Sequence, residues 1–142
     1  FYNLLGMETL GLRMERACDN AKKLAEFLNT YPDVTVNYPG LSDSLWHAQA
    51  EKVLQNGYGA ILTIRVGSKE RAFDLINTLT IPKIVSNIGD TKTLIIHPES
   101  TLNAHSTQKE KEEAGVFDDL IRISVGIEDV EDLIEDFKHA LK

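Results

Sequence analysis

An arginine stands in the middle of an apolar, β-branched run, residues 120–127, that predicts a strand. A guanidinium is always charged and presents a planar fork of N–H donors that matches a carboxylate in bidentate geometry. Arg122 is therefore a candidate for binding an organic anion. The alternative is an edge-strand arginine whose aliphatic stem covers apolar surface while its charged head stays in water, and spacing alone leaves both interpretations open.

A second candidate lies in a polar turn, Ser-Asn-Ile-Gly-Asp at residues 86–90. This turn separates two extended segments. An asparagine amide, or the backbone N–H groups that such a turn exposes, can donate hydrogen bonds to an anion. Ser86 and Asn87 are therefore candidate anion-binding residues. A plain turn asparagine without a ligand is the alternative for Asn87.

Other site chemistries find little support in the sequence. The four histidines, at positions 47, 97, 105 and 139, have no paired ligand spacing and no cysteine partner, so no metal site is predicted. The Gly-Tyr-Gly motif at 57–59 precedes a strand instead of opening a helix after one, so we interpret it as a turn and not as a nucleotide loop.

The chain has 142 residues, of which 42% are apolar and 26% charged, as expected for one soluble globular domain. Its net charge of −7 and the absence of a basic stripe argue against nucleic-acid binding. No apolar run approaches the roughly eighteen residues that would span a bilayer. A single cysteine, Cys18, is predicted to be a small buried side chain in a reducing, cytoplasmic compartment, and the start at Phe1 favours a piece of a longer protein.

Apolar periodicity and turn residues predict the elements that position these candidates. The expected helices are 9–29, 45–56 after a Ser44 cap, 69–79 after a Ser68 cap, 108–114 and 130–141. The expected strands are 34–38, 60–66, 84–85, 93–96 and 120–127. This order predicts an α+β fold of two layers, a mostly antiparallel sheet of about four or five strands with helices on one face.

Some side chains outside the candidate site also receive a prediction. Trp46, Tyr58 and Phe73 are expected in the core. The acidic run 128–136 is expected to be a solvated helix face, and Arg13 a surface or interdomain salt-bridge residue.

Four segments carry a resemblance to a known family. They are GMETL with LRM (6–14), SNIGDTKTL (86–94), HPEST (97–101) and LIRISVGIEDVEDLIEDFKHAL (120–141). In this order they resemble the pyridoxal-phosphate enzymes of cysteine and methionine metabolism. The motif Asn-Ile-Gly-Asp-Thr, together with the loop after His97-Pro98, is most similar to the O-acetylhomoserine sulfhydrylase branch.

The resemblance implies a larger enzyme. In the family a preceding large domain holds the cofactor through a Schiff-base lysine, a set of phosphate-binding residues and an aspartate at the pyridine nitrogen, and none of these motifs occurs here. Residues 1–142 are thus expected to be the single C-terminal substrate domain of fold-type-I architecture, inactive alone. Pyridoxal phosphate is expected in the parent enzyme, with no cofactor-binding, metal-binding or catalytic residue in this piece.

The same resemblance assigns roles to the candidate residues. Arg122 matches the arginine that holds the α-carboxylate of the amino-acid substrate, and Asn87 matches a serine that contacts this carboxylate in the cystathionine branch. Ser86 is a neighbour of that contact. The family's His-Pro loop borders the active-site mouth, but Leu102-Asn103-Ala104 departs from its pattern, so Ser100, Thr101 and His105 receive no catalytic role.

The resemblance implies that the parent replaces the acetate of O-acetylhomoserine at Cγ by sulfide or a thiol, giving homocysteine or methionine. Its expected partners are the amino-acid substrate, its own cofactor-binding domain and further copies in a homotetramer. Cystathionine γ-synthase, cystathionine γ-lyase and methionine γ-lyase are the nearest alternatives. A freestanding, non-catalytic α+β binding module is the alternative of another class, and the coding sequence upstream of Phe1 separates it from the enzyme.

Overall fold

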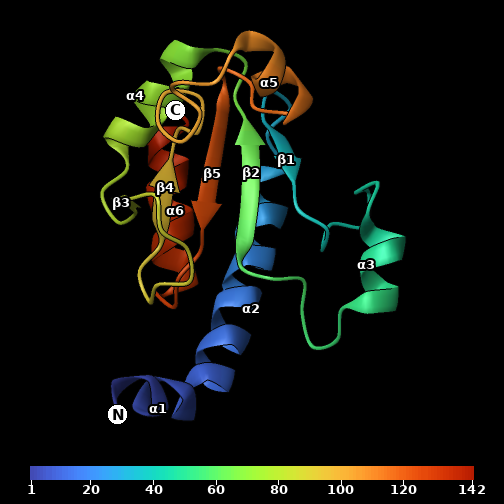
Figure 1. Cartoon of the computed structure of the whole chain (residues 1–142), viewed down its shortest axis with the longest axis vertical. Coiled ribbons are helices and arrows are strands. Elements are labelled where there is room, and N and C mark those ends of the chain that lie inside the picture. The colour runs from blue at the N-terminus through green and yellow to red at the C-terminus, as the bar shows by residue number, and fades with distance from the viewer.

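The computed structural model describes all residues from 1 to 142, and it contains one five-stranded sheet with six helices (Figure 1). The strand order is β1-β2-β5-β4-β3, and only the β3–β4 pair is parallel. The strands are β1 (Thr35–Asn37), β2 (Ile61–Arg65), β3 (Lys83–Ile84), β4 (Leu94–Ile96) and β5 (Leu120–Ser124). The predicted α+β class with a mostly antiparallel sheet is confirmed.

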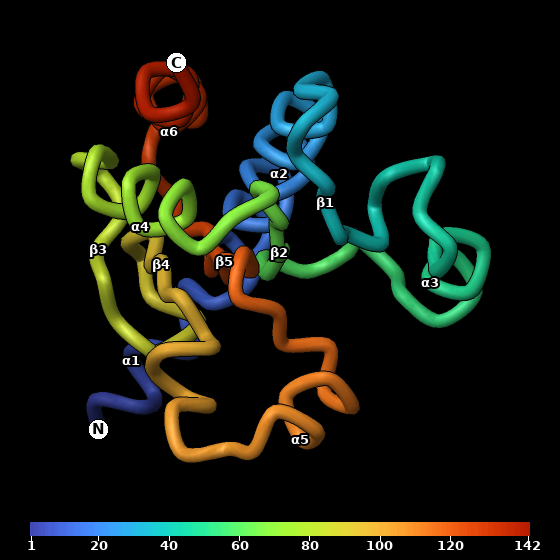
Figure 2. The backbone as a smooth tube through the Cα atoms, turned by 90° about the horizontal axis from the view of Figure 1, so that it is seen from above, coloured from blue at the N-terminus to red at the C-terminus, as the bar shows by residue number.

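Three helices cover one face of this sheet: α2 (Leu10–Leu28), α4 (Lys69–Thr78) and α6 (Val130–Ala140) (Figure 2). Because strand side chains alternate between faces, every second residue of β2 and β5 packs under the helices. The fully buried members of this core include Leu62, Ile64, Ile121, Ile123, Leu133 and Phe137. The predicted helix cap at Ser68 is present, since its side chain accepts a backbone N–H. The Asp129 side chain accepts one in the same way at the start of α6, where no cap was predicted.

The opposite face of the sheet carries the polar members of the same strands, among them Thr63, Arg65 and Arg122. No long helix covers this open face. It is bordered by the turn 86–92 and by residues 97–119, here called the β4–β5 connection, which contains the short helix α5 (Gln108–Glu113). Figure 2 shows α5 on the side of the sheet opposite α2 and α6.

The helix α3 (His47–Val53) stands away from the sheet, beyond the β1 edge (Figures 1 and 2). Two predictions here are wrong. Ser44 does not cap the helix, since its Oγ accepts the N–H of Trp46 and the helix begins at His47. Trp46 is 65% exposed, because the excursion that carries it runs outside the core. Phe73 on α4 was also expected in the core, but it is 38% exposed and is not a core member, whereas Tyr58 packs against the core as predicted.

The N-terminal helix α1 (Tyr2–Glu8) was not predicted, and none of its residues is buried. Together with the first turns of α2 it extends past the end of the sheet (Figure 1). Further along α2, Cys18 is half-buried beside Gly57, not fully buried as predicted, and partial burial raises the pKa of its thiol. No helix of the chain is long and apolar enough to cross a membrane.

Candidate functional site

The side chain of Arg122 lies on the open face of β5, between Thr63 on β2 and Ile96 on β4. Its Nη2 donates to the carbonyl oxygen of Ser86 at 2.6 Å and approaches that of Asn87 at 3.5 Å. Its Nε and Nη1 make no hydrogen bond, and the guanidinium has no salt-bridge partner. A positive charge with unused N–H donors therefore faces the open side of the sheet, where an anion can reach it.

The structure brings the three predicted site residues together, but by a different route from the one expected. The turn was predicted to offer donors to an anion. Instead, the backbone carbonyls of Ser86 and Asn87 accept hydrogen bonds from Arg122, while the Asn87 side-chain amide makes no hydrogen bond with it. These carbonyls hold one arm of the guanidinium fork and so orient the remaining donors.

Hydrogen bonds also shape the rest of the turn. Gly89 has a positive φ of 78°, which an L side chain rarely adopts, and its N–H donates to the Ser124 hydroxyl at 3.2 Å. The Asp90 carboxylate accepts the N–H of Lys92 at 3.0 Å, and this bond is the main cause that lowers the pKa of Asp90. The turn is thus an ordered feature that is attached to the strand carrying Arg122.

A polar network that the sequence did not indicate fastens the end of this turn; we call it the Glu128 clasp, and it consists of Asn20, Thr93, Gly126 and Glu128. The Glu128 carboxylate accepts the N–H of Thr93 at 2.5 Å and its hydroxyl at 2.9 Å. The Thr93 hydroxyl in turn accepts the N–H of Gly126 at 2.9 Å. The Asn20 amide donates to the carbonyls of Gly126 and Glu128 at 3.0 and 2.8 Å.

The clasp corrects the prediction that residues 128–136 are only a solvated helix face. Glu128 is half-buried and hydrogen-bonded, and at the far end of the run Asp136 accepts the N–H groups of Thr80 and Ile81. One sequence signal could have found the clasp: Asn20 occupies a position among the apolar residues of the buried face of α2.

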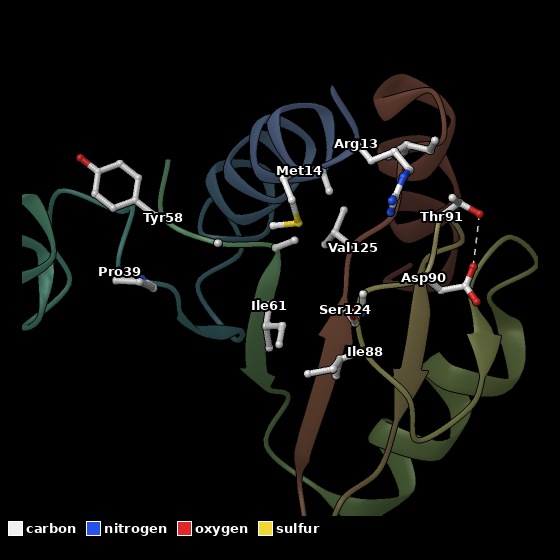
Figure 3. A pocket seen from close by; sticks show the side chains of 15 residues that line it. Arg13, Met14, Pro39, Tyr58, Ile61, Ile88, Asp90, Thr91, Ser124 and Val125 are labelled. Atoms are coloured by element: carbon white, nitrogen blue, oxygen red, sulfur yellow. Dashed lines mark hydrogen bonds between the residues drawn. The ribbon is translucent and has the colours of Figure 1, made fainter. Parts of the chain in front are cut away.

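A cavity of about 370 Å³ lies beside the turn, between α2 and the ends of β2 and β5 (Figure 3). Met14 and Val125 point toward one another in it, and Ile61 and Ile88 add apolar surface. Arg13 stands at its rim, where it donates to the Gly6 carbonyl and the Thr9 hydroxyl and forms no salt bridge. The surface salt bridge predicted for Arg13 is thus absent within this chain, and the interdomain alternative stays a prediction. The cavity is mainly an apolar recess.

The β4–β5 connection is anchored by buried polar groups. His97 is 3% exposed, and its ring nitrogens bond with the Ser100 hydroxyl at 2.8 Å and the Asp118 carbonyl at 2.7 Å. Glu99 accepts from Lys111 at 2.5 Å and from Lys69 at 2.8 Å, and these two bonds lower the pKa of Glu99 to about 2. No group of three His, Cys, Asp or Glu side chains is placed to hold a metal ion.

Comparison with known proteins identifies the class to which this architecture and site belong. The whole chain, residues 1–142, matches the family model described as Cys/Met metabolism PLP-dependent enzyme. The chain therefore belongs to the pyridoxal-phosphate-dependent enzymes of cysteine and methionine metabolism.

Individual relatives show which members of the family the chain is similar to. The chain is 44% identical to homocysteine synthase of Schizosaccharomyces pombe, over all of this chain and 34% of the relative, and 42% identical to an L-methionine gamma-lyase of Fusobacterium nucleatum, over all of this chain and 36% of the relative. Among solved structures, a Campylobacter jejuni protein assigned as an O-acetylhomoserine (thiol)-lyase matches 97% of this chain and 33% of its own, with a TM-score of 0.93 and 37% identity.

The chain thus spans about a third of the length of the relatives it matches. The Campylobacter jejuni structure contains an N'-pyridoxyl-lysine-5'-monophosphate. No lysine lines the cavity beside the turn, and Lys92, at the end of the turn, is exposed with its Nζ 3.9 Å from the Asp90 carboxylate.

Proposed function

We propose that residues 1–142 are the C-terminal, substrate-binding domain of a pyridoxal-phosphate-dependent O-acetylhomoserine sulfhydrylase. The parent enzyme replaces the acetate of O-acetylhomoserine at Cγ by sulfide or a thiol, and the products are homocysteine or methionine and acetate. The observation that carries this proposal is the unpaired guanidinium of Arg122 on the open face of the sheet, held by the Ser86–Asn87 turn.

In this proposal Arg122 binds the substrate α-carboxylate through an adjacent pair of unused N–H donors, the second N–H of Nη2 with that of Nε or of Nη1, while the Ser86 carbonyl accepts the other N–H of Nη2 and holds the group in place. Pyridoxal phosphate supplies an electron sink for bond cleavage at Cα when it is bound by the rest of the protein. Anchoring the carboxylate fixes the orientation of the Cα substituents, and that orientation selects which bond breaks. Asn87, whose amide is free, is the second proposed contact of the carboxylate, with Ser86 beside it.

The sister activities are the nearest rivals, and the similarity to an L-methionine gamma-lyase supports them too. All of these enzymes must anchor an amino-acid carboxylate, so Arg122 has the same role in each. A freestanding binding module has weaker support, because the whole chain matches the enzyme family.

Location and assembly complete the proposal. The single, unpaired Cys18 fits a reducing compartment, which supports a cytoplasmic location. The wholly exposed helix α1, which bears Tyr2, Leu4, Leu5 and Met7, supports packing against the preceding part of the protein. We propose a homotetramer for the parent enzyme, as the resemblance to the family implies.

The test compares the intact protein with the 142-residue chain. The intact protein is expected to bind pyridoxal phosphate, turn yellow and form homocysteine from O-acetylhomoserine and sulfide faster than it releases ammonia from methionine. The 142-residue chain alone is expected to stay colourless and inactive. An intact protein that cleaves methionine but ignores O-acetylhomoserine would move the assignment to methionine γ-lyase, and a colourless intact protein would remove the enzyme assignment altogether.

A further inference from the structure

We propose that Glu128 is a positioning residue for substrate capture. Through the Glu128 clasp it fixes the turn 86–92, and through that turn it sets the fork of Arg122 that receives the carboxylate. This inference rests on the proposed function, since it assigns to the same site a residue that does not touch the substrate.

The first step is that the polar groups of the clasp are largely buried and hydrogen-bonded to one another. Thr93 is fully buried and Asn20 is 1% exposed. Every buried side-chain nitrogen and oxygen of the protein has a hydrogen-bond partner. A fully satisfied buried network favours a single arrangement, because loss of any one partner leaves another polar group unpaired in a low dielectric.

The second step is that the clasp lies at the end of the turn that holds Arg122. Residues 86–92 are tied to the β5 side by the Gly89 bond to Ser124, by the bond from the Ile127 N–H to the Thr91 carbonyl at 2.9 Å, and by the clasp at Thr93. The carbonyls that orient Arg122 belong to the other limb of the same turn, which continues from β3, where the Lys83 N–H donates to the Thr93 carbonyl at 2.9 Å. Loosening Thr93 therefore lets those carbonyls shift relative to the guanidinium.

The third step is the connection to α2. The Asn20 amide joins this helix to the carbonyls of residues 126 and 128, and Nη2 of Arg16 approaches the second of these at 3.4 Å. In the proposed intact enzyme α2 follows the cofactor-binding part of the chain. The clasp thus links the position of that helix to the position of the substrate-binding turn.

A merely structural Glu128 makes a different prediction from a positioning Glu128. If it only stabilises the corner between β5 and α6, its loss lowers the melting temperature and leaves substrate recognition intact. If it positions the turn, its loss weakens the preference for a carboxylate in particular. The pair L-2-aminobutyrate and L-2-aminobutyramide separates the two, because these inhibitors differ only in that group.

The experiment uses the intact holoenzyme with Glu128→Gln and, as the matched control, Glu131→Gln. Glu131 carries the same charge three residues later, is exposed, and its side chain makes no hydrogen bond. For Glu128→Gln we expect the KM for O-acetylhomoserine to rise about tenfold, the scale of one lost charge-assisted hydrogen bond, with kcat within about twofold. The inhibition preference for the carboxylate over the amide is expected to fall by a similar factor, while Glu131→Gln matches wild type.

Two further variants keep the test decisive if Glu128→Gln folds poorly. Thr93→Ser keeps the hydroxyl of the clasp and is expected to retain the wild-type KM, whereas Thr93→Val lacks it and is expected to raise KM about tenfold, again the scale of a lost hydrogen bond to a charged group. Equal KM values for Thr93→Ser and Thr93→Val, or a lower melting temperature of Glu128→Gln with an unchanged carboxylate preference, would overturn the proposal. A wild-type holoenzyme that ignores O-acetylhomoserine would instead remove the proposed function, which is a separate outcome.

Discussion

Two arginines stand on the open face of the same sheet, on neighbouring strands, and their surroundings differ. Arg65 on β2 is paired with the buried Asp119 at 2.8 Å, and its guanidinium lies 3.9 Å above the ring centre of Phe117. Arg122 on β5 has neither an acidic partner nor an aromatic one, and its side-chain hydrogen bonds go only to backbone carbonyls.

The difference shows how the fold compensates the charge of one arginine and leaves the other available for the proposed anion binding. The β4–β5 connection brings Asp119 and Phe117 back over Arg65, so that its charge is compensated within the protein. The turn 86–92 orients the guanidinium of Arg122 but does not compensate its positive charge, because the backbone carbonyls that accept its hydrogen bonds carry no net charge. Anion binding by Arg122 therefore does not have to break an existing ion pair.

Arg122→Ala in the intact enzyme is the change expected to have the largest effect on this contrast. Loss of the bidentate contact should lower kcat/KM roughly 30- to 1000-fold, which corresponds to about 2–4 kcal/mol of transition-state stabilisation. The cofactor content should stay the same. Arg122→Lys should recover part of this loss, because a lysine restores the charge but not the fork. Steady-state kinetics provide the measurement, and Lys23→Ala, which removes an exposed cation from α2, is the control. Kinetics of Arg122→Ala equal to wild type would contradict a carboxylate-binding role.

Asp119→Ala should show the opposite pattern, with an effect on stability and not on capture. The change removes the partner of Arg65 and an acceptor for the N–H of Gly67, so we expect the unfolding free energy to fall by about 1–3 kcal/mol. Urea denaturation of the 142-residue chain measures this difference. Asp118→Ala is the matched control, since Asp118 is exposed and its side chain makes no hydrogen bond. If Asp119→Ala reduced kcat/KM as strongly as Arg122→Ala, the distinction between the two arginines would not hold.

The smallest effect is expected for Glu99→Gln in the β4–β5 connection, and it concerns the pH dependence of the melting temperature. The bonds from Lys111 and Lys69 lower the pKa of Glu99 to about 2, below the value near 4.3 of an unfolded glutamate. A depressed carboxyl pKa stabilises the fold above the unfolded value, and this contribution is lost as the pH falls through the folded value. Glu99→Gln should therefore lower the melting temperature by a few degrees at pH 7, and the gap to wild type should narrow progressively between about pH 4 and pH 2.

Melting curves of the 142-residue chain at several pH values check this dependence. The exposed Glu15 provides the control, because its side chain has no partner and Glu15→Gln should not alter the pH profile. A gap between wild type and Glu99→Gln that stays constant from pH 7 to pH 3 would show that Glu99 does not anchor the connection through its charge.

Much of the fold could be predicted because its elements carry local signals. The apolar spacing of the first and last long helices, and the β-branched runs around Leu62 and Ile123, follow periods of 3.6 and 2 that depend only on neighbouring residues. The predictions failed where a side chain depends on what the chain does elsewhere. Trp46 is apolar and so was expected to be buried, but the excursion that carries it leaves the sheet.

The candidate site divides in the same way. A guanidinium inside a strand is visible in the sequence, and the residues of the turn before it are visible too. Their hydrogen bonds span 35 and 36 residues, and those of the clasp between 33 and 108. No local pattern reports contacts over such separations, so Glu128 and Asn20 were not recognised as part of the site.

The amino-acid sequence by itself determined five of the six helices, the approximate positions of the strands, the mostly antiparallel α+β architecture and the presence of the Arg122 guanidinium on a strand. Only the tertiary structure decided that Arg65 is neutralised by Asp119 while Arg122 is not, and that carbonyls of the turn, not its amide, hold Arg122. The physical reason is that residue type sets the charge and the donors of a side chain, whereas the partners that satisfy them come from segments that only folding brings together.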